Sequence, residues 1–145
     1  MSILEFMRDD HRECDHFYAE AESALIAKET EKAADAFERF VRSTLHHFDM
    51  EEKELFLAFE KRTGMMGGPT QMMRYEHQQL RSLLESMRLA LSENRINDFF
   101  GIGESMMIML QQHNMKEEQM LYPMTDRALA GDAELMVRTL REMAR

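Results

Sequence analysis

The stretch that decides the fold is His47-Phe48-Asp49-Met50-Glu51-Glu52-Lys53-Glu54-Leu55-Phe56. It places a histidine four residues before a pair of glutamates, which leucine and an aromatic residue follow. The same order returns 113 − 47 = 66 residues later, in His113-Asn114-Met115-Lys116-Glu117-Glu118-Gln119-Met120-Leu121-Tyr122. A lone histidine precedes each stretch by the same distance, since 47 − 11 = 36 and 113 − 77 = 36, and each follows an acidic residue. This repeat predicts two similar helical hairpins.

The spacing also predicts a metal centre. Residues four apart on an α-helix differ by about 40° in direction, so each histidine and its glutamate share one face. The lone histidines add one imidazole each from the neighbouring helices. The candidate ligands are His11, His47, Glu51, His77, His113 and Glu117. Four imidazoles and two carboxylates suit two metal ions, with two histidines on each ion and both glutamates bridging. This mixture favours iron or manganese over a structural zinc.

Two further histidines and one cysteine lie outside the repeat. His16 and His46 have no counterpart 66 residues away in the ligand pattern, so we predict that neither binds metal. Glu13-x-x-His16 is the only Glu-x-x-His sequence, which argues against the paired motifs of a ferritin-type centre. A single cysteine, Cys14, excludes an internal disulfide and is interpreted as a small core residue.

The periodic segments predict an all-α protein. Helices are expected at residues 2–28, 31–62, 69–92 and 95–122, with Pro123 ending or bending the last of them. A short final helix is expected from 132 to about 143. Short connections between long helices favour an up-down-up-down four-helix bundle. We expect residues 1–145 to form a single domain.

Charge and composition exclude several classes of partner. The net charge of −9 argues against nucleic acid and anionic membrane surfaces. No apolar run reaches the roughly 18 residues of a membrane-spanning helix, and the N-terminus resembles no signal peptide. A cytoplasmic protein is therefore expected. The 16 methionines are interpreted as core residues, in preference to a copper(I) site.

Two expectations concern the surroundings of the metals. Leu55 and Leu121, with Met7 and Met73, are expected to form an apolar lid on one side. On the other side, Asp15 and Arg81 lie four residues after the lone histidines. Because they occupy equivalent positions with opposite charges, an ion pair between them across the bundle is expected; the alternative is that Arg81 bends outward to solvent.

The histidine and glutamate pattern resembles the hemerythrin-like family, also called HHE cation-binding domains. The resemblance rests on the six candidate ligands and on Asp10-His11-Arg12, Glu76-His77-Gln78-Gln79-Leu80-Arg81 and the two repeated stretches. It implies a non-haem di-iron centre with an oxo or hydroxo bridge, inside a four-helix bundle. Two histidines, two carboxylate oxygens and the bridge then leave a six-coordinate iron one open position.

The chain departs from the oxygen-carrying hemerythrins at two places. They have a second histidine where Arg81 stands here, and they end with His-x-x-x-x-Asp in place of His113-x-x-x-Glu117. The pattern is more similar to bacterial iron-cluster repair proteins, whose N-terminal cysteine-containing domain has no counterpart in this sequence.

The sequence leaves three functions open. The first is reversible binding of dioxygen or nitric oxide for sensing, storage or protection. The second is a di-iron oxidoreductase acting on peroxide or nitric oxide, or an iron donor for the repair of damaged iron-sulfur clusters. The third is a structural bundle with incidental metal. Whether the chain is an enzyme, and what its redox partner is, also stay open at this point.

Overall fold

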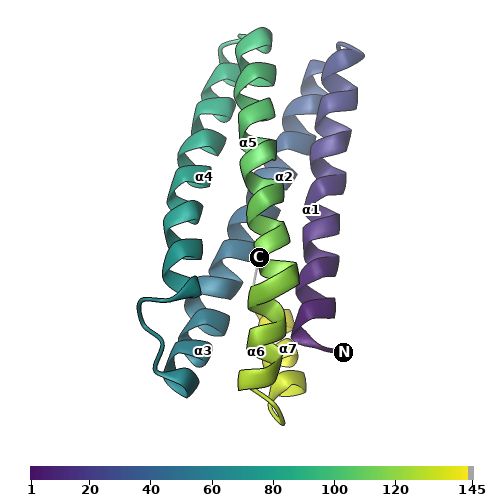
Figure 1. Ribbon diagram of the computed structural model, residues 1–145. Helices are drawn as coiled ribbons and strands as arrows, with labels where there is room; N and C mark the ends of the chain where they lie inside the picture. The colour runs from purple at the N-terminus through teal and green to yellow at the C-terminus, as the bar shows by residue number, and fades with distance from the viewer. Residues whose placement is uncertain (144–145) are drawn as a thin grey trace.

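The chain folds into an all-α bundle of four long rods, closed at one end by a short helix (Figure 1). The computed structural model describes residues 1–143, and no strand occurs among them. The rods run up, down, up and down. They are, in order, α1 (Ile3–Ile26); α2 (Thr30–Met50) continued by the π-helical turn η1 (Glu51–Leu55) and α3 (Phe56–Thr63); α4 (Pro69–Ser92); and α5 (Ile96–Lys116) continued by η2 (Glu117–Leu121) and α6 (Tyr122–Ala128). The closing helix is α7 (Ala133–Glu142).

The first and last parts of the bundle are fastened together at the start of α1. Ser2 caps this helix in a reciprocal capping box with Glu5. The next free amides, of Ile3 and Leu4, donate to the carboxylate of Asp126 in α6 at 2.9 and 3.1 Å. A carboxylate at a helix N-terminus also interacts favourably with the helix dipole. The lower end of the bundle is therefore held by α6.

Pro123 does not end the fourth rod, because helix continues through it to Ala128. Proline clashes with the carbonyl four residues before it in a regular α-helix. Here the wider π-helical turn η2 ends at Leu121, two residues before Pro123, and relieves that crowding. Proline does not cause the turn, because the equivalent position in the second rod is Leu57 (123 − 66 = 57) and η1 forms there as well.

The hydrophobic core consists of two clusters, one above and one below the middle of the bundle. The upper cluster includes Tyr18, Phe37, Phe40, Leu84, Phe99 and Met106. Cys14 belongs to it as expected, and burial raises the pKa of its thiol to about 12. The lower cluster includes Ile3, Met7, Met50, Leu55, Phe56, Met73, Leu121 and Tyr122. In the described part of the chain, five methionines are buried in the core, as predicted, but the prediction is wrong for six others, which are exposed: Met1, Met65, Met66, Met72, Met115 and Met120. None of the helices in residues 1–143 is long and apolar enough to cross a membrane.

Candidate metal centre

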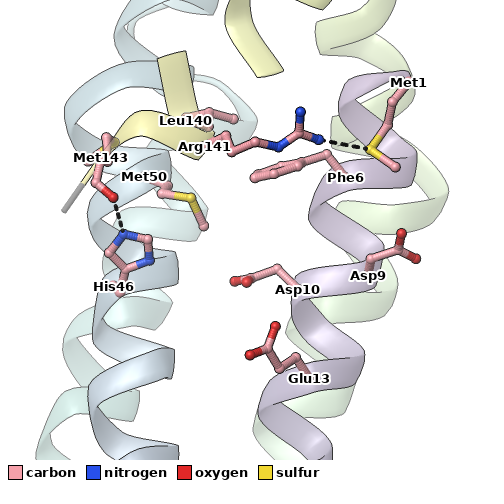
Figure 2. A pocket seen from close by; sticks show the side chains of 10 residues that line it. All are labelled: Met1, Phe6, Asp9, Asp10, Glu13, His46, Met50, Leu140, Arg141 and Met143. Atoms are coloured by element: carbon pink, nitrogen blue, oxygen red, sulfur yellow. Dashed lines mark hydrogen bonds between the residues drawn. The ribbon is translucent and has the colours of Figure 1, made fainter. Parts of the chain in front are cut away.

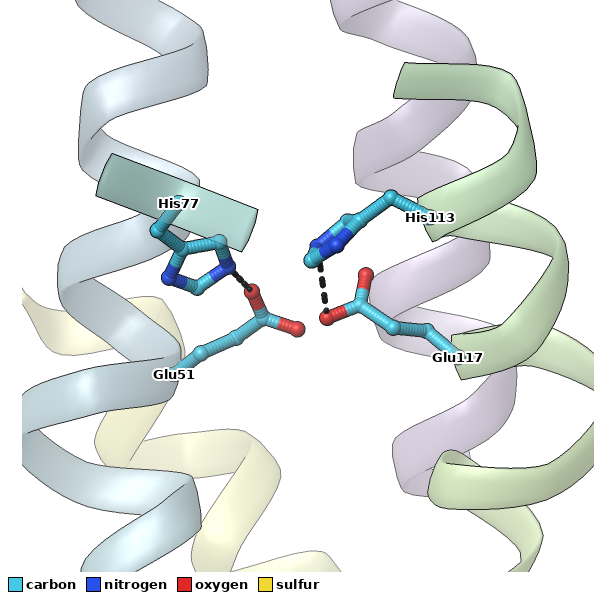
Figure 3. Close-up of side chains that lie close together, drawn as sticks. All are labelled: Glu51, His77, His113 and Glu117. Carbon is cyan, nitrogen blue, oxygen red and sulfur yellow. Dashed lines mark ion pairs between the residues drawn. The ribbon is translucent and has the colours of Figure 1, made fainter. Parts of the chain in front are cut away.

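The six side chains that the repeat predicts as ligands converge between the two core clusters. Four of them point toward one another from three rods in Figure 3. All six are between 0% and 4% exposed: His11, His47, Glu51, His77, His113 and Glu117. Burial of so many ionisable groups is unfavourable unless they are paired with one another or with an ion. The burial therefore marks the cluster as a site and not as ordinary core.

Each glutamate directs its two oxygens to different histidines. Glu117 places Oε1 3.0 Å from His11 Nε2 and Oε2 3.2 Å from His113 Nε2. Glu51 places Oε1 3.1 Å from His77 Nε2 and Oε2 3.7 Å from His47 Nε2. Two positions for a cation result. We call them the first half-site, beside His11 and His47, and the second half-site, beside His77 and His113. Both carboxylates lie between them.

The donor atoms of the second half-site fit a metal ion. Its four nearest atoms are Glu51 Oε1, His77 Nε2, His113 Nε2 and Glu117 Oε2, and all four are buried without a hydrogen-bond partner. The same four residues form one group able to hold a cation, and His11, His47 and Glu117 form another. Buried polar atoms without partners are costly. A cation at each position would satisfy them.

The other nitrogen of every histidine in the cluster donates to a carboxylate. His47 Nδ1 lies 2.7 Å from Asp10, and His113 Nδ1 lies 2.8 Å from Glu76. The remaining pairs are His11 with Glu118 at 2.7 Å and His77 with Glu52 at 2.6 Å. These bonds fix the ring orientation and leave each Nε2 aimed at the centre, as metal-binding histidines require. The acidic residues before the lone histidines (Asp10 and Glu76) and the second glutamates of the repeat (Glu52 and Glu118) thus orient the histidine rings.

The electrostatics of the cluster also favour a cation. Burial lowers the pKa of His113, but Glu117, Glu51 and Glu76 outweigh it and raise that pKa to about 9. Burial likewise opposes protonation of His47, yet Glu51 and Asp10 hold its pKa well above the usual value. The carboxylates therefore retain protons on the imidazoles. A metal ion would displace those protons and take over their charge.

Tyr122 is a site residue that the sequence analysis missed. Its hydroxyl lies 2.7 Å from Glu51 Oε2 and 2.9 Å from Glu117 Oε1, either of which can accept its hydrogen, and its side chain is 0% exposed. In a regular α-helix, a residue five positions after Glu117 points about 140° away from it. The turn η2 closes with a hydrogen bond from the Tyr122 amide to the Glu117 carbonyl, which brings position five onto the same face.

The expected ion pair between Asp15 and Arg81 is wrong. Arg81 instead binds both carboxylate oxygens of Glu52, at 3.0 and 3.2 Å. The Glu52 carboxylate, which accepts a hydrogen bond from His77, also binds Arg81, so the arginine side chain points toward η1 and not across the bundle toward Asp15. Asp15 accepts a hydrogen bond from Gln111 at 3.1 Å. Arg81 thus supports the second half-site indirectly: it holds Glu52, and Glu52 holds the ring of His77.

His16 and His46 lie outside the two groups able to hold a cation among the described residues. His16 is on the surface, where it pairs with Glu20 at 2.9 Å. His46 faces a neighbouring pocket between α1, α2 and α7, and its Nε2 lies 3.4 Å from the Met143 carbonyl (Figure 2). Asp10 reaches this pocket from the opposite wall (Figure 2).

The expected apolar lid is in place. Leu55, Leu121, Met7 and Met73 are at most 2% exposed and belong to the lower cluster. With the rest of the lower cluster they make the bundle below the site apolar and buried. We expect Leu121→Ala to speed autoxidation of a ferrous centre, because the cavity admits water. The rate is followed by absorption after reduced protein is exposed to air. Leu57→Ala, at an exposed position of α3, is the control; equal rates in the two variants would count against the lid.

Comparisons with known proteins agree with this geometry. The family model described as hemerythrin HHE cation binding domain matches residues 2–143, which is nearly the whole chain. Searches among curated proteins and among solved structures each found no significant match.

Proposed function

Because this chain belongs to the hemerythrin HHE cation-binding domain family, we propose that it is a non-haem di-iron protein that binds dioxygen or nitric oxide. One observation carries the proposal: two groups of buried donors share the carboxylates of Glu51 and Glu117. His11 and His47 would hold one iron, and His77 and His113 the other. Imidazole with carboxylate is a donor set that suits iron.

The burial of the cluster restricts what can react there. An iron pair supplies electrons and a coordination position for a small molecule when it is bound. The protein supplies a dry enclosure, since residues of both core clusters surround ligands that are at most 4% exposed. A diatomic molecule or peroxide fits this enclosure. The same burial favours retention of the metal over its donation to another protein.

The carboxylates around the histidines keep the imidazoles in one orientation. Asp10, Glu52, Glu76 and Glu118 each accept a hydrogen bond from an Nδ1 atom. Their negative charge makes the imidazoles more basic and stabilises the more oxidised state of a bound metal. Such a site suits reversible capture of an oxidising ligand.

Anaerobic reduction followed by separate exposure to dioxygen, nitric oxide and hydrogen peroxide tests the proposal. We expect absorption changes with dioxygen or nitric oxide that reverse when the gas is removed, with metal-free protein as the control. Sustained consumption of peroxide with an added reductant would assign the protein to the oxidoreductases instead. Iron-loaded protein whose spectrum responds to none of the three would contradict both functions.

A further inference from the structure

The two half-sites are equivalent in their histidines but not in the residues beside them. A shift of 66 residues relates Tyr122 to Phe56 (122 − 66 = 56) and Asn114 to Phe48 (114 − 66 = 48). All four side chains are buried. The repeat therefore places a phenol where its other copy has a phenyl ring. When η1 and Phe56 are aligned position by position with η2 and Tyr122, only the difference between Phe56 and Tyr122 adds a polar atom to the cluster.

The Tyr122 oxygen is surrounded by donor atoms of the first half-site. It lies 3.0 Å from His47 Nε2 and 3.2 Å from His11 Nε2, in addition to its contacts with the two glutamates. A phenol carries one hydrogen and can donate it to one acceptor at a time. The hydroxyl therefore cannot satisfy all four surrounding atoms, whereas a cation shared by them can.

The distances match those between ligands of a single ion. Two ligands that lie about 2.1 Å from an octahedral ion, at right angles to one another, are about 3 Å apart. The four contacts of the Tyr122 oxygen, between 2.7 and 3.2 Å, are of this length. With Glu51 Oε2 counted, 3.7 Å from His47 Nε2, each half-site has two imidazoles and two carboxylate oxygens. The tyrosine oxygen is a further donor that only the first half-site has.

Aromatic rings line the second half-site and bring no ligand atom to it. Phe48 stacks on His77 with ring centroids 3.9 Å apart and presents its edge to His113 at 6.1 Å. Phe56 lies 6.0 Å from His77, in the place that corresponds to Tyr122. This half-site also contains the central donor atoms that have no hydrogen-bond partner, which belong to Glu51, His77, His113 and Glu117.

We propose that the Tyr122 oxygen is a seventh metal ligand, that it serves the first half-site alone, and that the small exogenous ligand therefore binds in the second half-site. This inference rests on the proposed di-iron function. The metal takes the place of the hydroxyl proton, which leaves to solvent, so the bound group is a phenolate. Phe48 and Phe56 then form the apolar wall against which the exogenous ligand lies.

The first test compares ferric protein with its Tyr122→Phe variant by absorption and resonance Raman spectroscopy. A phenolate bound to ferric iron gives a visible charge-transfer band and enhanced ring vibrations. We expect both in the wild-type protein and neither in Tyr122→Phe, with signals expressed per bound iron. Tyr75→Phe is the matched control, since Tyr75 is 64% exposed and the same hydroxyl is removed; it should keep the band.

The second test uses azide as the exogenous probe. Phe56→Tyr places a second phenol beside the second half-site, so we expect this variant to keep its iron and lose azide binding. Tyr122→Phe opens the first half-site, so its iron should bind additional azide.

The outcomes distinguish the inference from the function on which it rests. Wild-type protein that takes up no iron would overturn both. Iron-loaded protein without a phenolate band, or with a band that survives Tyr122→Phe, would overturn the inference alone. Unchanged azide binding in Phe56→Tyr would overturn the assignment of the second half-site.

Discussion

Glu51→Ala and Glu117→Ala should each remove at least one iron atom per chain. Each carboxylate directs one oxygen to each half-site, so neither half-site stays complete when one glutamate is lost. Each glutamate lies between one histidine of each half-site, so its loss removes the negative charge and the bridging oxygen atoms that these two histidines share. Metal analysis of protein expressed with ample iron measures the effect. The fold should persist, because the two core clusters above and below the site are untouched.

The other histidines of the chain provide matched controls for this experiment. His16→Ala removes a surface imidazole, and His46→Ala removes a buried one that directly precedes His47. We expect both variants to retain their iron. If His46→Ala lost as much iron as His47→Ala, the repeat would have been assigned in the wrong register.

Glu52→Gln should weaken iron binding by about 10- to 100-fold, the usual effect of removing a partner of a metal-binding histidine. Burial raises the pKa of Glu52, but His77 and Arg81 outweigh it and lower that pKa to about 2. The group is therefore a carboxylate at every pH at which the protein is used. Its replacement by an amide removes the negative charge that His77 Nδ1 contacts at 2.6 Å. Competition with a chelator of known affinity measures the change.

Glu54→Gln is the control for Glu52→Gln. It makes the same change of charge two residues away in the same turn η1, on the side of the pocket that Ala58 and Lys61 line. We expect its iron affinity to match that of the wild type. Equal losses in both variants would show that net charge matters and that the bond to His77 does not.

The repeat of 66 residues predicted the bundle because period and spacing are local properties of the sequence. His47 with Glu51, and His113 with Glu117, needed only the pitch of a helix to be placed on one face. The lone histidines needed only the up-down order of the rods. The helix ends at Gly64 and Pro69 were visible for the same reason, since glycine ends helices and proline begins them.

Tyr122 could not be found by that reasoning because the local pitch of the helix changes at the site. In an α-helix, position four after Glu117 shares its face and position five does not, so the spacing indicates Leu121 and not Tyr122. The π-helical turn rotates the next residue inward in both rods. One signal was available in the sequence: a tyrosine and a phenylalanine occupy the same place in the two copies, and only the tyrosine requires a polar partner when buried.

The wrong pairing of Asp15 with Arg81 has a different cause. The sequence shows that Asp15 and Arg81 have opposite charges at equivalent positions. It does not show which of two carboxylates, Asp15 or Glu52, the arginine side chain can reach. Arg81 reaches Glu52 on the adjacent rod, where His77 already holds that carboxylate in position. The sequence contained Glu52 as part of the repeat, but spacing alone does not show that it faces His77.

The iron content of the wild-type protein tests the central claim most directly. Protein expressed with iron in the medium, purified without chelators and analysed for iron, manganese and zinc should carry two iron atoms per chain, one for each group of donors. One tightly bound zinc per chain, with no uptake of iron, would contradict the account.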